Sequence, residues 1–292
     1  MTRSLFLSGM LALCLSTTIT STANAQNTAE WSEPFPPHKV AGNLYYVGSK
    51  GLATYLVTTP EGHVLINSNL EDSLPLIQKN VEQLGFKFSD VKILLISHAH
   101  WDHCAGSASI IKATGAKYMV MEQDVAVVES GNAPKKSRLK PAYLGFPTAK
   151  VDRVLKDGDE VKLGGATLVA HLTPGHTPGC TTWTLQVEEN GKKLDAVIIG
   201  SPNVNPGYVL VNNKDYPGIA TDYEKTFRVL KSLPVDLFLG AHGSYYDMEA
   251  KVKNLEGAAT NPFIDKEGYK RYVEDREQAF LKEWEKQKAA KK

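Results

Sequence analysis

Residues 98–103 carry the densest group of metal-capable side chains in the sequence. They read His-Ala-His-Trp-Asp-His and directly follow an apolar run from Val91 to Ile96. Imidazole nitrogens and carboxylate oxygens are ligands that zinc prefers. If the apolar run is a strand, its alternation places His98 and His100 on one face, and the turn after it can bring the other two side chains into the same pocket. We therefore expect a metal site rather than a polar loop of hydrogen-bonded histidines.

Two later loops each add one histidine to this set. Residues 173–179 read Thr-Pro-Gly-His-Thr-Pro-Gly, and residues 235–240 form an apolar run that ends just before Ala-His-Gly. A catalytic zinc takes three protein ligands and keeps one position for water. Six candidate ligands are enough for two such sites, and they are His98, His100, Asp102, His103, His176 and His242.

The other histidines and the cysteines have simpler interpretations. His38 lies in a proline-rich segment, and we expect it to be solvated. His63 has no ligand-type neighbours. We expect that His171 does not bind the metal and at most contacts a residue that does. Cys104 and Cys180 could pair or bind zinc, although a buried, inert thiol is the more common state.

The elements that position these residues predict a mixed α/β chain. Apolar positions at helical spacing predict helices over 74–85 and 106–114 and a charged amphipathic helix over 269–284. The least regular stretch is 130–150, whose basic run at 135–140 is either a solvated loop or a flap that attracts a carboxylate-bearing substrate. Strands are predicted at 43–47, 54–58, 63–67, 91–96, 117–121, 159–163, 166–171, 181–185, 196–200 and 235–240.

The first 25 residues have the features of a cleaved secretory signal peptide. Arg3 precedes an apolar run that is too short to span a membrane, and residues 23–25 read Ala-Asn-Ala. We expect a periplasmic protein with a single domain over 26–292, built from pseudo-two-fold halves of about 30–130 and 150–292. The formal charge is +1, and removal of Arg3 makes it zero. Such an even charge argues against a nucleic-acid partner.

The three histidine motifs together resemble the metallo-β-lactamase superfamily. They are His-Ala-His-Trp-Asp-His, Thr-Pro-Gly-His-Thr-Pro-Gly and Gly-Ala-His-Gly, and the resemblance covers nearly all of residues 40–265. It implies an α/β fold, a four-layer αββα sandwich of two mixed β-sheets with helices on the outer faces. It also implies two Zn²⁺ per chain. The first would be held by His98, His100 and His176, and the second by Asp102, His103 and His242.

The absence of an acidic residue after the strand at 196–200 indicates a subclass within the superfamily. Thiolesterases and lactonases of the superfamily place a bridging aspartate after the strand that precedes the last histidine loop, whereas here Ser201-Pro202-Asn203 follows that strand. This is similar to subclass B3. It implies a β-lactamase that opens the β-lactam amide of penicillins, cephalosporins and carbapenems by a zinc-bound hydroxide and gives antibiotic resistance. Asp102 would orient the hydroxide, and Ser201 and Asn203 would bind the substrate carboxylate, although strand capping explains both residues almost as well.

Two alternatives stay open. The chain could be another hydrolase of the same superfamily, acting on a thiolester or a lactone. It could also be a zinc-binding protein without catalysis, in which Cys104 or Cys180 closes the site as a fourth ligand. In each enzymatic case the partner is a small molecule, and we expect a monomer.

Overall fold

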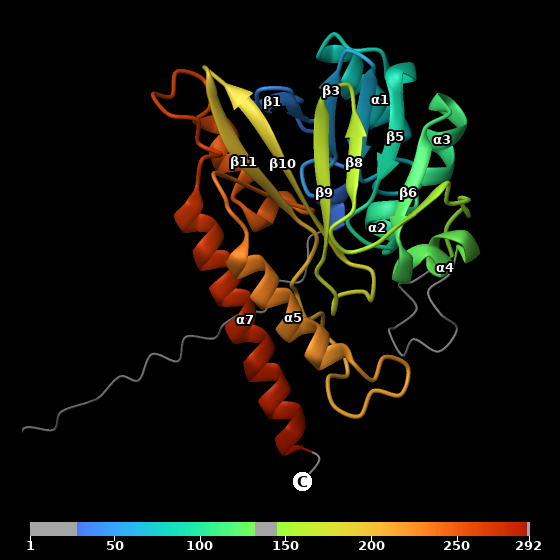
Figure 1. The fold of residues 1–292 in the computed structure, drawn as a ribbon, viewed down its shortest axis with the longest axis vertical. Helices are drawn as coiled ribbons and strands as arrows, with labels where there is room; N and C mark the ends of the chain where they lie inside the picture. Colours follow the sequence, from blue (N-terminus) through green and yellow to red (C-terminus); the bar gives the residue numbers. More distant parts are fainter. Residues whose placement is uncertain (1–27, 132–144, 291–292) are drawn as a thin grey trace, which may run out of the picture.

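Two β-sheets lie face to face, and helices cover their outer sides (Figure 1). The structure is a computed structural model that describes residues 28–131 and 145–290. The arrangement confirms the αββα sandwich. The expected signal peptide and the basic run at 135–140 lie outside the described residues. None of the described helices is both long and apolar enough to cross a membrane.

The first sheet contains seven strands within the described residues, in the order of the chain. β1 to β4 are antiparallel, whereas β4 to β7 are parallel. Parallel neighbours need crossover connections, which here contain helices α1 (Leu74–Gln83), α3 (Ser107–Thr114) and α4 (Glu122–Ser130). The strands are β1 (His38–Ala41), β2 (Leu44–Tyr46), β3 (Tyr55–Thr59), β4 (Gly62–Ile66), β5 (Val91–Leu95), β6 (Lys117–Met121) and β7 (Arg153–Leu155).

The second sheet has the strand order β12-β11-β10-β9-β8 within the described part of the chain. Its members are antiparallel except for β11 and β12, which are parallel and are connected through α5 (Ile219–Ser232). Helix α7 (Lys266–Ala289) lies beside α5, and α6 (Met248–Lys253) precedes it. The strands are β8 (Glu160–Leu163), β9 (Ala166–Leu172), β10 (Thr181–Glu189), β11 (Lys192–Ile199) and β12 (Leu237–Gly240).

Side-chain alternation in the strands divides the interior into two cores. In β4, Val64 and Ile66 belong to the core between the sheets, together with Trp183 of β10. Leu65, between them, belongs to the core beneath the helices, together with Ile77 of α1. Successive residues of a strand point to opposite faces, so a strand that is buried on both sides is apolar throughout. This explains the continuous apolar runs of the sequence.

The predicted helices and strands are present, with ends displaced by a few residues. Helices α4, α5 and α6 and strands β1 and β7 were not predicted, although the buried residues Tyr223, Phe227 and Leu230 of α5 lie at helical spacing. The expectation that His38 is solvated is wrong. Its ring is buried and stacks between those of Tyr46 and Phe263, because β1 brings it into the packed core.

A buried tyrosine connects the first sheet to the end of the second. The Tyr55 hydroxyl of β3 donates a hydrogen bond of 2.8 Å to the Gly240 carbonyl and lies 3.0 Å from the Tyr246 hydroxyl. Gly240 ends β12, two residues before His242. This contact therefore ties the last histidine loop to the opposite sheet.

Replacement of Tyr55 by phenylalanine should destabilise the fold without changing side-chain volume. The variant leaves a buried carbonyl without this donor, so we expect the free energy of unfolding to fall by about 1–3 kcal/mol. Urea unfolding measures it. The control is Tyr45→Phe, on a half-buried ring, which should change stability by less than about 0.5 kcal/mol. Equal stabilities for the two variants would contradict the role of the Tyr55 hydroxyl.

Candidate metal centre

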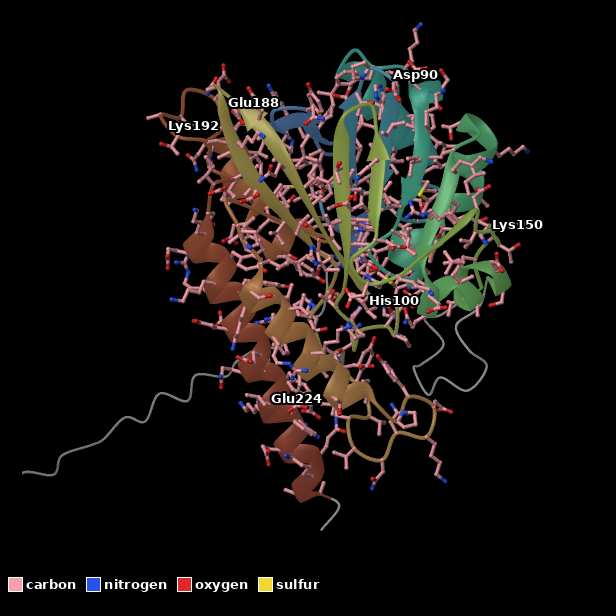
Figure 2. All side chains as sticks on the ribbon, viewed as in Figure 1. Asp90, His100, Lys150, Glu188, Lys192 and Glu224 are labelled. Carbon is pink, nitrogen blue, oxygen red and sulfur yellow. The ribbon has the colours of Figure 1, made fainter. Side chains whose placement is uncertain are left out.

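The six candidate ligands come together at one edge of the sandwich, where Figure 2 labels His100. Strand β5 ends at Leu95, so His98 and His100 lie in the loop after it. The expectation that they share a strand face is therefore wrong, although their ring centroids are 4.7 Å apart. Helix α2 (Trp101–Cys104) begins directly after His100 and carries the aspartate and the third histidine of the motif.

His98, His100 and His176 form the first group. Their ring centroids lie 4.7, 4.6 and 4.7 Å apart, which is almost an equilateral triangle. One nitrogen of each ring lies within 4.8 Å of the others, and all three rings are buried. Three imidazoles that converge in this way can hold one metal ion between them.

Asp102, His103 and His242 form the second group. The Asp102 Oδ2 lies 3.3 Å from the Nε2 of His103 and 3.6 Å from the Nε2 of His242. The two Nε2 atoms are 3.1 Å apart. The ligand atoms of His98, Asp102 and His103 also lie within 4.8 Å of one another, so the two groups adjoin.

Backbone and side-chain acceptors orient the rings. The Nδ1 of His176 lies 2.8 Å from the Asn203 carbonyl, which requires this nitrogen to carry the hydrogen. The Nδ1 of His98 lies 3.1 Å from the Ser97 hydroxyl. A partner on one ring nitrogen leaves the other available as a ligand. In both residues the available nitrogen is Nε2.

The electrostatics favour neutral imidazoles at His98, His100, His176 and His242 and an ionised carboxylate at Asp102. Burial and the neighbouring histidines hold the pKa values of His98 and His100 well below the ordinary value. Burial also lowers the pKa of His176 to about 4 and that of His242 to about 3. Burial raises the pKa of Asp102, but the charge and hydrogen bond of His103 outweigh it and lower the pKa overall.

These residues fit a divalent metal. Neutral imidazoles and an ionised carboxylate are the forms that bind one. The Nε2 of His98 is buried and has no hydrogen-bond partner, which is costly for a polar atom unless a ligand meets it. A set of five imidazoles and one carboxylate, without thiolate, suits zinc.

Ser201 lies beside the second group and Asn203 beside the first, and neither belongs to a metal-capable group. The Ser201 side chain is buried, and its hydroxyl lies 3.2 Å from that of Tyr245, whose ring packs 5.0 Å from that of His242. The Asn203 amide donates a hydrogen bond of 3.4 Å to the Tyr272 hydroxyl. Ser201 thus contacts His242 indirectly, through Tyr245. Asn203 contacts His176 directly, through its backbone carbonyl.

The cysteines have the character of buried, inert thiols. Cys104 and Cys180 are free, and burial raises the pKa of both, to about 12 for Cys180. Neither belongs to a metal-capable group among the described residues. His171 lies apart from these groups, with its Nε2 2.8 Å from the Thr184 hydroxyl.

Three further residues at the site were not identified from the sequence. The Trp31 ring lies 5.9 Å from that of His242, and the Tyr208 hydroxyl donates to the His176 carbonyl at 2.8 Å. The Asp124 carboxylate contacts both loops of the first group. Nothing in the local sequence of Trp31 or Asp124 indicates a site, because each reaches it through long-range packing.

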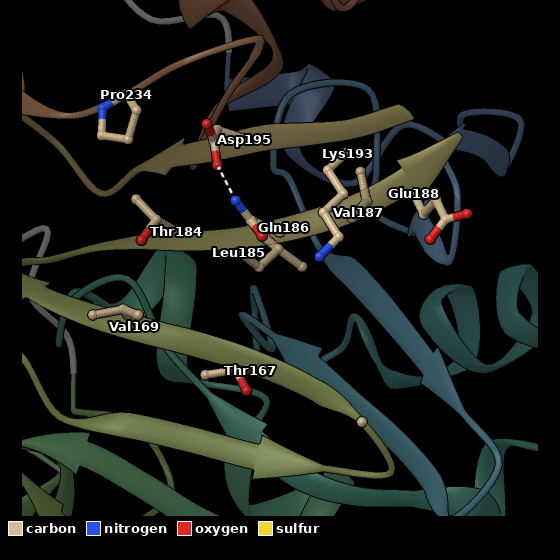
Figure 3. A pocket seen from close by; sticks show the side chains of 11 residues that line it. Thr167, Val169, Thr184, Leu185, Gln186, Val187, Glu188, Lys193, Asp195 and Pro234 are labelled. Atoms are coloured by element: carbon tan, nitrogen blue, oxygen red, sulfur yellow. Dashed lines mark hydrogen bonds between the residues drawn. The ribbon is translucent and has the colours of Figure 1, made fainter. Parts of the chain in front are cut away.

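A separate shallow cavity lies on the outer face of the second sheet (Figure 3). Its wall includes polar side chains of β9, β10 and β11, and Gln186 donates a 2.9 Å hydrogen bond to Asp195 across it. None of the six candidate ligands lines it. Apolar residues such as Val169 and Pro234 line it as well, so its lining is mixed.

Comparison with known proteins agrees with this geometry. A family model described as the metallo-beta-lactamase superfamily matches residues 51–242, which include all six candidate ligands. The chain belongs to the metallo-β-lactamase superfamily. This membership accounts for both the αββα layers and the position of the histidine loops at one edge.

Solved structures of this superfamily are similar over most of the chain. The metallo-β-lactamase FEZ-1 from Legionella gormanii is 51% identical, with a TM-score of 0.84, and covers 88% of this chain and 98% of its own. The class B3 di-zinc enzyme LRA-12 from an Alaskan soil metagenome is 34% identical, with a TM-score of 0.83, and covers 88% and 97%.

Curated relatives match over shorter stretches. A hydroxyacylglutathione hydrolase from Polaromonas is 32% identical over 125 residues, which are 42% of this chain and 38% of that protein. The chain spans 49%, 69% and 38% of the first three such relatives. Hydrolases other than β-lactamases are therefore among its homologues.

The metal-free protein should lose stability as the pH falls below about 6.5. A histidine whose folded pKa is lowered takes up its proton more readily after unfolding, so stability is complete above the unfolded pKa of roughly 6.5 and is lost toward the folded values of about 4 and 3. Each such imidazole can lower the free energy of unfolding by up to about 1.4 kcal/mol for each pH unit in this range. Urea unfolding of chelated protein at pH 7, 6 and 5 tests this.

The control for this pH dependence is the double variant His98→Asn/His176→Asn. It removes two of the groups concerned and should have a shallower dependence between pH 7 and pH 5. An unfolding free energy that is the same at both pH values in the unaltered protein would contradict the interpretation.

Proposed function

We propose that this protein is a zinc-dependent β-lactamase of the subclass B3 type that hydrolyses penicillins, cephalosporins and carbapenems and so gives antibiotic resistance. The observation that carries the proposal is the adjoining pair of three-residue groups, combined with a serine where a bridging carboxylate would stand. The likeness to FEZ-1 and LRA-12 over nearly their whole length supports it.

The proposed ligands divide equally between two Zn²⁺ ions. His98, His100 and His176 would hold the first ion. Asp102, His103 and His242 would hold the second ion. The distances of 3.1 to 3.6 Å between the Asp102 Oδ2 and the two Nε2 atoms support this assignment. The strand β11 ends before Ser201, which offers no carboxylate to join the two ions.

The residues of the chain then have distinct tasks. Zinc bound there would lower the pKa of a water molecule to about 7 and polarise the β-lactam carbonyl as a Lewis acid. The Asp102 carboxylate would accept a hydrogen bond from that water and direct its lone pair toward the carbonyl. The Ser201 hydroxyl, with Asn203 beside it, would bind the carboxylate of the substrate. No serine is required as a nucleophile.

Hydrolysis of a thiolester is the second candidate function. The likeness to hydroxyacylglutathione hydrolases favours it, although that match covers less than half of either chain. Both functions use the same metal ions and attack a carbonyl, so they differ in the acyl group that the pocket accepts. A thiolester assay run beside a β-lactam assay separates them.

The setting of the reaction follows from the same proposal. A β-lactamase acts where the antibiotic crosses the envelope, and residues 1–25 have the features of a signal peptide. We propose a periplasmic, monomeric enzyme whose partner is a small molecule.

The direct test is hydrolysis of a carbapenem and a cephalosporin by zinc-loaded protein, followed by absorbance of the β-lactam amide. We expect turnover of both, loss of turnover with a chelator, and recovery on addition of zinc. Asp102→Asn should lower kcat by a factor of at least about 100, since it removes both a charged ligand and a hydrogen-bond acceptor.

Two results would oppose the proposal. Fully zinc-loaded protein that hydrolyses neither β-lactam, but cleaves a thiolester, would establish the second candidate instead. Unchanged activity of Asp102→Asn would refute the assignment of the second ion.

Ser201→Ala should weaken substrate binding more than it slows the reaction. A hydrogen bond to a charged group contributes roughly 1.5–3 kcal/mol, so we expect KM for a carbapenem to rise by about 10-fold or more with little change in kcat. Steady-state kinetics measures both. The control is Ser232→Ala, at the exposed end of α5. A KM equal to that of the control would remove Ser201 from the binding site.

A further inference from the structure

Asp124 joins the two loops that carry the first group of histidines. It lies in the first turn of α4 and is 1% exposed. Its Oδ2 accepts a hydrogen bond of 2.8 Å from the Ala99 amide and one of 2.9 Å from the Thr177 hydroxyl. Its Oδ1 accepts a hydrogen bond of 2.9 Å from the Gly179 amide. All three donors belong to residues 98–103 or 173–179.

Two of the three donors are immediate neighbours of the ligands. Ala99 lies between His98 and His100, and Thr177 follows His176. Asp124 is in neither metal-capable group, so it acts on the rings only through the backbone that carries them. A single buried carboxylate thus links the positions of all three imidazoles.

The glycine of the second loop shows how close this contact is. A Cβ atom at Gly179 would lie 2.5 Å from the Asp124 carboxyl carbon and 2.7 Å from its Cβ, so no larger residue fits. The loop is pressed directly against the carboxylate. The Thr181 amide also donates to the Ser97 carbonyl at 2.7 Å, a contact that joins the residue before His98 to the first residue of β10.

We propose that Asp124 is a positioning residue that sets the spacing of His98, His100 and His176 and thereby the affinity of the first metal ion. The inference rests on the proposed assignment of these three histidines to one zinc. Groups that orient metal ligands from behind typically change metal affinity by about 10- to 100-fold when they are removed.

The test measures zinc binding to metal-free protein by competition with a chromophoric chelator, and the visible spectrum of the Co²⁺-loaded protein. Asp124→Asn keeps the side-chain volume but replaces one accepting oxygen by an NH₂ group, so at least one of the three donors loses its acceptor. We expect it to weaken one of the two zinc equivalents by about 10- to 100-fold and to change the Co²⁺ spectrum. The matched control is Asp236→Asn, on a carboxylate that also accepts a backbone amide, from Asp195 at 2.9 Å, but away from the histidine loops. The control should lower stability and leave affinity and spectrum unchanged.

A milder pair of variants keeps the proposal testable if Asp124→Asn does not fold. Thr177→Ala removes one of the three hydrogen bonds and should weaken zinc binding several-fold, whereas Thr177→Ser retains the hydroxyl and should restore it. Zinc affinity and Co²⁺ spectra equal to those of the unaltered protein in Asp124→Asn, or in Thr177→Ala where the first variant does not fold, would overturn the proposal. These readouts need no substrate. Zinc-binding protein that hydrolyses no β-lactam would therefore refute the proposed function and leave the role of Asp124 intact.

Discussion

The Nε2 atoms of His103 and His242 lie 3.1 Å apart, and the Asp102 carboxylate lies 3.3 Å from the first of them. Around them stand three more buried imidazoles. Burial makes charged side chains costly, so this many ionisable groups can be buried together only if the rings are neutral and the carboxylate charge is compensated. A divalent cation meets both conditions, because it accepts the ring lone pairs and offsets the negative charge. The remainder of the fold serves to keep this crowded set in place.

The two sheets meet this requirement by presenting loops at a common edge. β5 belongs to the first sheet and β12 to the second. The loop after β5 carries His98 and His100, and the loop after β12 carries His242. The loop between β9 and β10 adds His176. The Thr181 amide at the start of β10 donates to the Ser97 carbonyl, so the loops of the two sheets are joined by their backbones. The site therefore depends on how the sheets face each other, and a shift of either sheet would separate the two groups of ligands.

Buried hydrogen bonds, rather than surface charges, hold these loops in register. The Trp183 indole of β10 donates to the Ile96 carbonyl at 3.0 Å, and Asn67 joins the Ser97 amide to the Ala53 carbonyl. Such polar groups would be costly without their partners, so each contact favours one geometry. Exposed ion pairs such as that of Lys117 and Asp152 are screened by water and add little. The energy that maintains the site thus comes from the interior.

By itself, the sequence determined the mixed α/β class and all six candidate ligands, since strand ends and glycine-rich loops are local signals that survive without tertiary information. The four layers followed from the resemblance of the histidine motifs to the superfamily. It also placed Ser201 after β11. Only the tertiary structure decided that His38 is buried, that His98 and His100 lie beyond the strand, and that Asp124 connects residues 98–103 with residues 173–179. These features arise from packing between elements distant in sequence, and no pattern within one segment encodes which distant segment will lie against it.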